Sequence, residues 1–319
     1  MTKKAWIVIF LFIFLAGCNL PLAAQEAPIS RTEVLQLATQ TPAALPAQPQ
    51  SPTEVVLIPG TPVQIEGAAY LAYQLPGDPF RFVCQEPCAL DPRYISAEYH
   101  GFRAAHSRMV EMLGIDTLAE LQPVDMHLVF DDSICSSNPY GHAYIYNGVH
   151  QAYTCTDGPG IYPDLEEKIQ KAALASEQYF PIHEYMHTLF FGRLSGMAGS
   201  YYDYKAEFFH DYVVPVPAFV IGTMDPASFC TQDSGLAPGD YGGALIRELC
   251  QKNGFDLEYL KKSLIELDAL YQSGGGKGPV NGYQHSAPTV AQYRDILNAL
   301  LGSDTTAAFA AACWPPELF

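Results

Sequence analysis

The sequence is poor in basic residues and in charge of either sign. Its 17 Lys and Arg stand against 34 Asp and Glu, the formal net charge is −17, and only 16% of the residues are charged. A nucleic-acid-binding protein needs a basic surface for phosphates, so this class is excluded. Because 49% of the residues are hydrophobic, wholesale disorder is excluded too.

Several motifs with a known chemistry are also missing. The chain has no G-x-S-x-G sequence of a serine hydrolase and no C-x2-C pair of a structural zinc site. The run Gly274–Gly278 contains Lys277 but lacks the spacing of a phosphate-binding loop. We interpret it as a connector.

An apolar run near the N-terminus is too short to span a membrane. Lys3 and Lys4 precede thirteen residues, Ala5–Gly17, which would rise about 20 Å as a helix against a hydrocarbon core of ~30 Å. This arrangement is typical of a secretory signal. Its ending, Leu-Ala-Gly-Cys, resembles the bacterial lipobox, in which the cysteine is lipidated.

We therefore expect residues 1–17 to be a lipoprotein signal peptide and Cys18 to carry the lipid that attaches the protein to the membrane. The expected location is the cell envelope, at the outer face of the membrane. The alternative is an ordinary signal peptide in which Cys18 is incidental. Residues 18–64 are rich in Pro, Ala, Gln and Thr, which predicts a stalk.

The other cysteines predict disulfides, because an exported protein meets an oxidising compartment. Seven remain after Cys18, so at least one has no partner within the chain. Short separations favour Cys84–Cys88 and Cys135–Cys155. Cys230 is expected to pair with Cys250 or Cys313.

From about Ile65 the composition is globular, and the pattern predicts strands early and helices late. The fold class expected is α+β, with an α/β subdomain over 65–194 and a mostly helical subdomain over 195–319. The predicted strands are 124–130 and 142–153, and the second is expected at a sheet edge. The predicted helices are 94–113, 164–178, 180–191, 204–214 (closed by Pro215), 257–271, 289–301 and 305–312.

The sequence His183-Glu184-Tyr185-Met186-His187 is an H-E-x-x-H motif in one of these helices. Residues at i and i+4 share a helix face, so both imidazoles can reach one metal ion. Glu184 can then act as a general base on a metal-activated water. The alternative is a helix with two structural histidines. Apolar flanks predict a buried helix, in which such a polar cluster is costly without partners.

Two acids downstream extend the motif. Glu207 lies 20 positions after His187, and Asp211 follows Glu207 at i+4. Over about 30 residues, 182–212, the chain resembles the gluzincins, the thermolysin-like group of zinc metallopeptidases. This resemblance implies that His183, His187 and Glu207 bind Zn²⁺ and that Asp211 orients His183. It also implies a zincin-like fold, with a mixed sheet whose edge strand lies over the active-site helix.

Some positions stay open or depart from that family. Ala206 precedes Glu207, where the thermolysin-like pattern has Asn, so the family's substrate contacts there are not implied. His210 and, more weakly, Asp203 are alternative third ligands.

The family also uses a Tyr or a His to polarise the substrate carbonyl. We expect His285 or Tyr202 in this role. The predicted edge strand, with His142, Tyr144 and Tyr146, is the candidate for binding the substrate backbone.

These expectations combine into one hypothesis: a membrane-anchored, extracytoplasmic zinc metallopeptidase that hydrolyses a peptide or protein substrate with Glu184 as general base. One alternative is a non-catalytic binding lipoprotein with a degenerate zincin domain. A second is a metal-binding envelope protein without a zincin fold. No nucleic-acid partner is expected.

Overall fold

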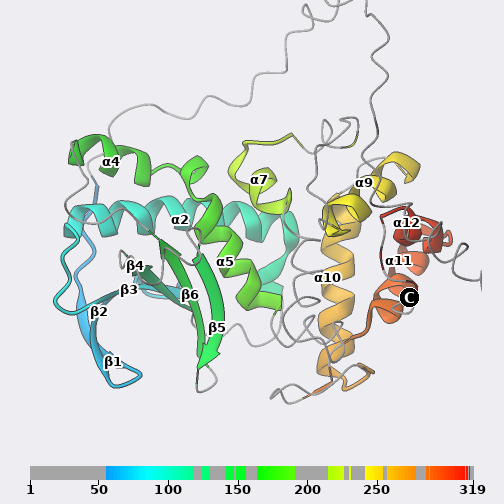
Figure 1. The fold of residues 1–319 in the computed structure, drawn as a ribbon, viewed down its shortest axis with the longest axis horizontal. Coiled ribbons are helices and arrows are strands. Elements are labelled where there is room, and N and C mark those ends of the chain that lie inside the picture. Colours follow the sequence, from blue (N-terminus) through cyan, green and yellow to red (C-terminus); the bar gives the residue numbers. More distant parts are fainter. Residues whose placement is uncertain are drawn as a thin grey trace, which may run out of the picture. The chain divides into compact units, whose positions relative to one another are not determined.

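A computed structural model gives the structure of residues 55–117, 124–129, 141–146, 149–155, 164–190, 215–225, 230, 241–253, 257–277, 285–286, 288–312, 314 and 316. Strands and helices in this part form a mixed sheet with helices packed on it (Figure 1). The expected α+β class is therefore confirmed. The compact unit begins at Val55, and Ile58 is already buried in its core, so it begins upstream of Ile65.

The sheet has six strands in the spatial order β1-β2-β3-β4-β6-β5. β3, β4 and β6 run parallel to one another, and the remaining neighbours pair antiparallel. β5 therefore forms the edge beyond β6. The strand bounds are β1 Thr61–Ile65, β2 Ala68–Tyr73, β3 Phe80–Gln85, β4 Val124–Val129, β5 Gly141–Tyr146 and β6 Val149–Cys155.

The segment 142–153 is a hairpin of β5 and β6, so the prediction of one strand was wrong, although its edge position is confirmed for β5. The register pairs Tyr146 with Val149 across a two-residue connection. The alternation of polar and apolar residues continues across so short a connection, so the residue pattern does not show that the segment contains two strands. The dipeptide Asn147-Gly148, typical of two-residue hairpin turns, was the signal overlooked.

All described elements after β6 are helical. The helix expected over 164–178 ends instead at Ala172, where a 3₁₀ turn follows. A second helix begins soon afterwards, because Pro181 fits a first turn but not a helix interior. Pro215 is the first residue of α7, whereas the helix expected over 204–214 lies outside the described residues. The helix 241–253 was not foreseen. The helices are α2 Pro92–Leu113, α4 Leu165–Ala172, α5 Tyr179–Phe190, α7 Pro215–Ile221, α9 Tyr241–Asn253, α10 Leu257–Gln272, α11 Val290–Leu301 and α12 Thr306–Ala311, with 3₁₀ turns at Ile115–Thr117 and Ala175–Glu177.

Helices α2 and α5 pack on one face of the sheet (Figure 1). Alternate residues of β3, including Phe80 and Phe82, point into this layer, as does Met126 of β4. They meet Phe102 of α2 and Ile182 of α5 in the same core cluster. This layer is the main hydrophobic core, and it determines the position of the H-E-x-x-H helix.

The opposite face of β4 is buried as well, although the residues that it carries there, Asp125 and His127, are polar. Asp125 accepts hydrogen bonds there from Arg81 of β3 and, at 3.2 Å, from Gln151 of β6. His127 hydrogen-bonds to Gln151 and stacks on Tyr153 with ring centroids 4.4 Å apart. Because these residues come from three strands, the network favours one register of the parallel strands.

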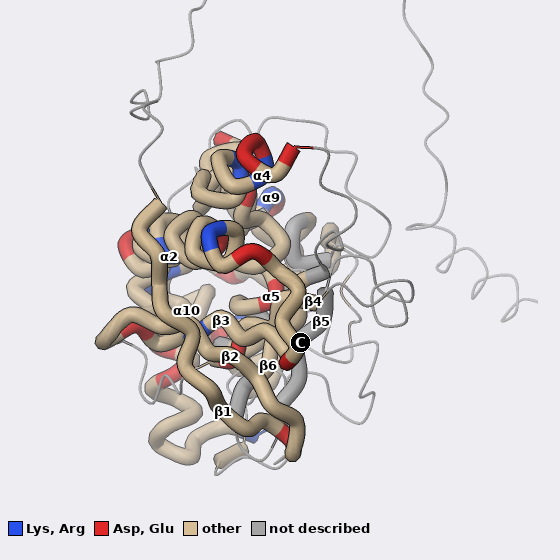
Figure 2. The backbone as a smooth tube through the Cα atoms, turned by 90° about the vertical axis from the view of Figure 1, so that its left-hand side faces the viewer, with Lys and Arg blue, Asp and Glu red and all other residues tan. Residues whose placement is uncertain are grey.

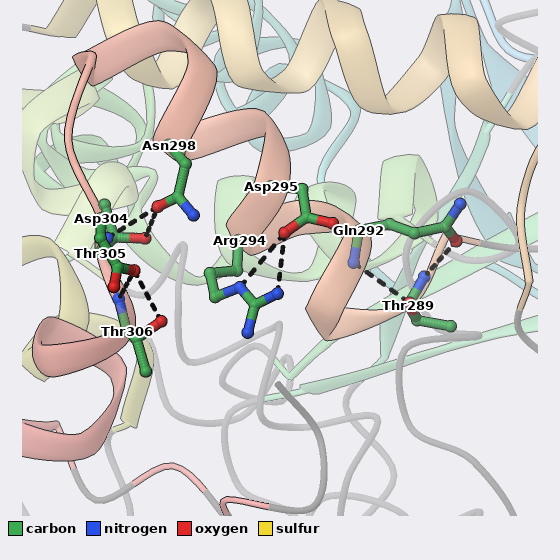
Figure 3. A network of polar contacts seen from close by, with 8 residues as sticks. All are labelled: Thr289, Gln292, Arg294, Asp295, Asn298, Asp304, Thr305 and Thr306. Carbon is green, nitrogen blue, oxygen red and sulfur yellow. Dashed lines mark hydrogen bonds and ion pairs between the residues drawn. The ribbon is translucent and has the colours of Figure 1, made fainter.

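Helix ends are held by side chains that the sequence already marks. Asp164 caps α4 by accepting from the backbone N–H of Glu167 at 3.1 Å. Acidic residues lie in the first turn of α4 and basic residues follow them (Figure 2), and Lys171 pairs with Glu167. Thr289 and Gln292 form a capping box at the start of α11 (Figure 3).

Two disulfides lie within the described residues. Cys84 is bonded to Cys88, as predicted, and Cys230 is bonded to Cys250 rather than to Cys313. The pairing Cys135–Cys155 stays a prediction, because Cys135 lies outside the described residues. Within the part that the structure describes, no helix has both the length and the apolar character to cross a bilayer.

A close approach of α2 to the end of α4 suggests a first test. A Cβ on Gly101 of α2 would overlap the carbonyl oxygen of Ala172. Although alanine normally favours a helix by about 1 kcal/mol, we expect Gly101→Ala to lower the free energy of unfolding by about 1–3 kcal/mol through this clash. Urea denaturation measures it. The matched control is Ala104→Gly at an exposed position of α2, which should cost about 1 kcal/mol. Stabilisation by Gly101→Ala would contradict the packing described.

Candidate metal-binding and catalytic site

The motif helix begins where the sequence predicts. The backbone carbonyl of Gln178 accepts the N–H of Ile182 at 3.0 Å, which makes Gln178 the residue that precedes the helix. Pro181 lies in the first turn, where a missing N–H costs no helical hydrogen bond. The helix then runs to Phe190, so all five motif residues are helical.

Burial divides α5 into two faces. Ile182, Tyr185 and Met186 are fully buried in the core against α2 and the sheet. On the other side His183 is partly exposed, and Phe180, one turn before it, is 39% exposed. At about 100° per residue, positions 180, 183 and 187 share one side of a helix, nearly opposite to position 185. The face of α5 on which both motif histidines lie is therefore the one that the described core does not cover.

His183 lies in an environment that favours a neutral imidazole. The ring of Tyr179, one turn earlier, stacks on it with centroids 6.0 Å apart. Burial lowers the pKa of His183 to about 4. A neutral imidazole has a free lone pair, which is the form that binds a metal ion.

Glu184 is the most unusual residue of the motif. It is only 3% exposed, and its Oε2 atom has no hydrogen-bond partner among the described residues. Burial raises the pKa of this carboxyl to about 8. A buried carboxylate normally has a partner, because an unpaired one costs folding free energy. A dication nearby would reverse the effect of burial and favour the ionised form.

The structure describes only part of the predicted site. His187 lies on α5, but its side chain is outside the described residues, as are Tyr202, Glu207 and Asp211 entirely. The alternative ligands Asp203 and His210, and the lipidation residue Cys18, lie outside as well. Among the described side chains, no group of three or more His, Cys, Asp and Glu residues could hold a metal ion. The ligand set thus stays a prediction.

His285 is described but is not brought to the motif by any contact that the structure records. Its ring lies edge-on to Tyr271 at the end of α10, with centroids 5.5 Å apart. It follows a glycine-rich connection and lies near Gly274. Its assignment as the group that polarises a substrate carbonyl stays a prediction.

The edge strand lies beside the motif helix. α5 contacts both β5 and β6, and among the described strands β5 pairs with β6 alone. An unpaired edge can accept an extended peptide as a further strand. The side chains of His142, Tyr144 and Tyr146 on β5 are outside the described residues.

From the sequence alone we did not identify two residues that connect α2 to the motif helix, His106 and Gln178. His106 of α2 lies with its Nε2 atom 3.2 Å from the hydroxyl oxygen of Tyr185, and both side chains are buried. The side chain of Gln178, which precedes α5, is also buried and bonded to α2. One sequence signal could have indicated such a contact: His106 is a polar residue among the apolar residues of the buried face of α2.

Comparisons with known proteins reveal no relative: no family model, no curated protein and no solved structure matches this chain.

The Oε2 atom of Glu184, which has no described hydrogen-bond partner, suggests a second test. In protein treated with a chelator, we expect Glu184→Met to raise the free energy of unfolding by about 1–3 kcal/mol, because it removes an unsatisfied buried polar group at similar volume. Urea denaturation measures it. The matched control is Thr188→Val, because the Thr188 hydroxyl donates to the Tyr185 carbonyl at 2.6 Å. That change should destabilise, and a similar loss in Glu184→Met would show that the carboxyl is satisfied.

Proposed function

We propose that this protein is a zinc-dependent metallopeptidase of the cell envelope, attached to the outer face of the membrane by lipid on Cys18. The observation that carries the proposal is the buried Glu184, whose Oε2 has no hydrogen-bond partner among the described residues. Such a group destabilises the fold, so its presence between two motif histidines suggests a chemical role. The H-E-x-x-H spacing and the resemblance to gluzincins name that role.

The donor set suits zinc. His183 lies with a neutral imidazole on the face of α5 that is partly exposed among the described residues, and His187 and Glu207 would complete three protein ligands of the types that zinc prefers. Asp211 would hold the second ring nitrogen of His183 and so orient its ring. Zinc, when bound, supplies Lewis-acid activation of water and of the substrate carbonyl.

The protein's own residues then move the proton. Glu184 would accept a proton from the attacking water and pass it to the leaving amine. His285 or Tyr202 would donate a hydrogen bond to the developing oxyanion. The free edge of β5, next to α5, would hold the substrate backbone as an added strand. The proposed substrate is therefore an extended peptide or a loop of a protein.

Metal content tests the ligand assignment. We expect one zinc per purified wild-type chain by elemental analysis. Glu207→Ala should lose most of this zinc, because it removes one of the three proposed protein ligands. His210→Ala should retain the metal, and Glu258→Ala, at an exposed position of α10, is the matched control. Loss in His210→Ala but not in Glu207→Ala would reassign the third ligand. A wild-type chain without zinc would contradict the proposal.

Turnover tests the role of Glu184. Glu184→Gln keeps the size of the side chain but cannot accept a proton, so we expect peptide hydrolysis to fall by roughly 10²–10⁴-fold with zinc retained. A library of quenched fluorescent peptides measures the rate. Glu177→Gln, at an exposed position before α5, should leave the rate unchanged. Full activity in Glu184→Gln would refute the mechanism, whereas zinc binding without turnover in the wild type would favour a non-catalytic binding lipoprotein.

A further inference from the structure

Helix α2 contacts the H-E-x-x-H helix through two polar connections in an otherwise apolar layer. Both connections lie on the side of α5 that faces away from the motif histidines. One reaches Tyr185 in the middle of the motif, and the other reaches Gln178 just before the helix begins. Neither residue is among the proposed ligands or catalytic groups.

The first connection joins Tyr185 to His106. The His106 Nε2 atom lies 3.2 Å from the Tyr185 hydroxyl oxygen, and the two rings meet edge to face with centroids 5.2 Å apart. Phe80 and Phe102 pack around both rings. A buried hydrogen bond in such surroundings is directional, so it favours one orientation of the tyrosine ring.

The second connection joins Gln178 to Glu98. The Gln178 side-chain N–H₂ donates to Glu98 Oε2 and to the backbone carbonyl of Ala172, each at 2.9 Å. Glu98 is held in turn by the Tyr94 hydroxyl at 2.6 Å. Since the Gln178 carbonyl also accepts the first hydrogen bond of α5, this residue ties the start of the helix to α2 and to the end of α4.

The spacing of the two connections constrains α5 along its axis and about it. The partners on α2, Glu98 and His106, are eight residues apart, and those on the α5 side are seven apart, which correspond to helical rises of about 12 and 10 Å. Contact at two such points leaves little freedom to slide. Each motif histidine is two residues from Tyr185, which places it about 160° away around the helix axis. Fixing the tyrosine ring therefore also fixes the direction of the opposite face.

We infer that Tyr185 and Gln178 are positioning residues, which hold the H-E-x-x-H helix on His106 and Glu98 in the one orientation that presents His183 and His187 to the same metal ion. This inference rests on the proposed zinc site. A ligand set tolerates only small departures from its preferred distances. A rotation of α5 would therefore weaken zinc binding without removing a ligand.

Zinc affinity of the full chain, measured by competition with a chromophoric chelator, tests the inference. We expect Tyr185→Phe to bind zinc about tenfold more weakly, the size of effect seen when groups that orient metal ligands are lost. Gln178→Met should weaken it similarly and independently. His106→Leu should match Tyr185→Phe, and the double variant should lose no more, because both changes break one hydrogen bond.

The matched control is Tyr99→Phe, which removes another buried hydroxyl of the same core. The Tyr99 hydroxyl donates to Asp78 at 2.6 Å and accepts from the Leu75 N–H at 2.9 Å, with no bond to α5. It should lower the melting temperature but leave zinc affinity unchanged. A parallel fall in affinity with Tyr99→Phe would show a general effect of stability and would overturn the inference.

The remaining outcomes separate the two proposals. Wild-type zinc affinity in both Tyr185→Phe and Gln178→Met, beside a zinc-binding wild type, would overturn the positioning roles and leave the metallopeptidase proposal intact. Absence of zinc from the wild type would overturn both.

Discussion

The packing of α5 against α2 and the sheet is the interaction on which the rest of the structure depends. Ile182, Tyr185 and Met186 are fully buried in this layer, and each buried side chain of this size contributes about 1.5–3 kcal/mol. The helix cannot rotate without exposing them. The buried apolar residues therefore determine the direction of the polar ones, and His183, which is partly exposed, lies on the side of α5 that the described core does not cover.

This packing also explains how the fold tolerates a destabilising group. Glu184 lies at the border between the buried and the open face, where its carboxyl is shielded from water without a described hydrogen-bond partner. The surrounding core supplies the free energy that offsets this cost. Active sites commonly keep such groups, because the same desolvation that destabilises the fold shifts a pKa toward neutrality.

The two faces of the sheet contribute differently. The face toward α2 and α5 is apolar and positions the motif helix, whereas the other face carries the buried network of Arg81, Asp125 and Gln151. Hydrogen bonds of this kind contribute little net free energy, but they discriminate strongly between strand registers. A correct register places β6, and with it the edge strand β5, beside α5.

The sequence by itself determined the local features. Pro92 and Gly114 delimit α2, Asp164 caps α4, and Thr289 caps α11, because caps and breakers act through neighbouring backbone groups. It also placed all of H-E-x-x-H on one helix. The predictions from sequence were wrong at the hairpin of β5 and β6 and at the end of α4, because the residue pattern there continues across the turn between two elements.

Only the tertiary structure decided which face of α5 is covered, that Glu184 has no described partner for Oε2, and that His106 and Glu98 lie behind the motif. These facts depend on residues about 80 positions apart in the chain that meet across a packed layer, and neither periodicity nor spacing carries that information. The pairing of Cys230 with Cys250 was open for the same reason, since sequence separation does not measure distance in the fold.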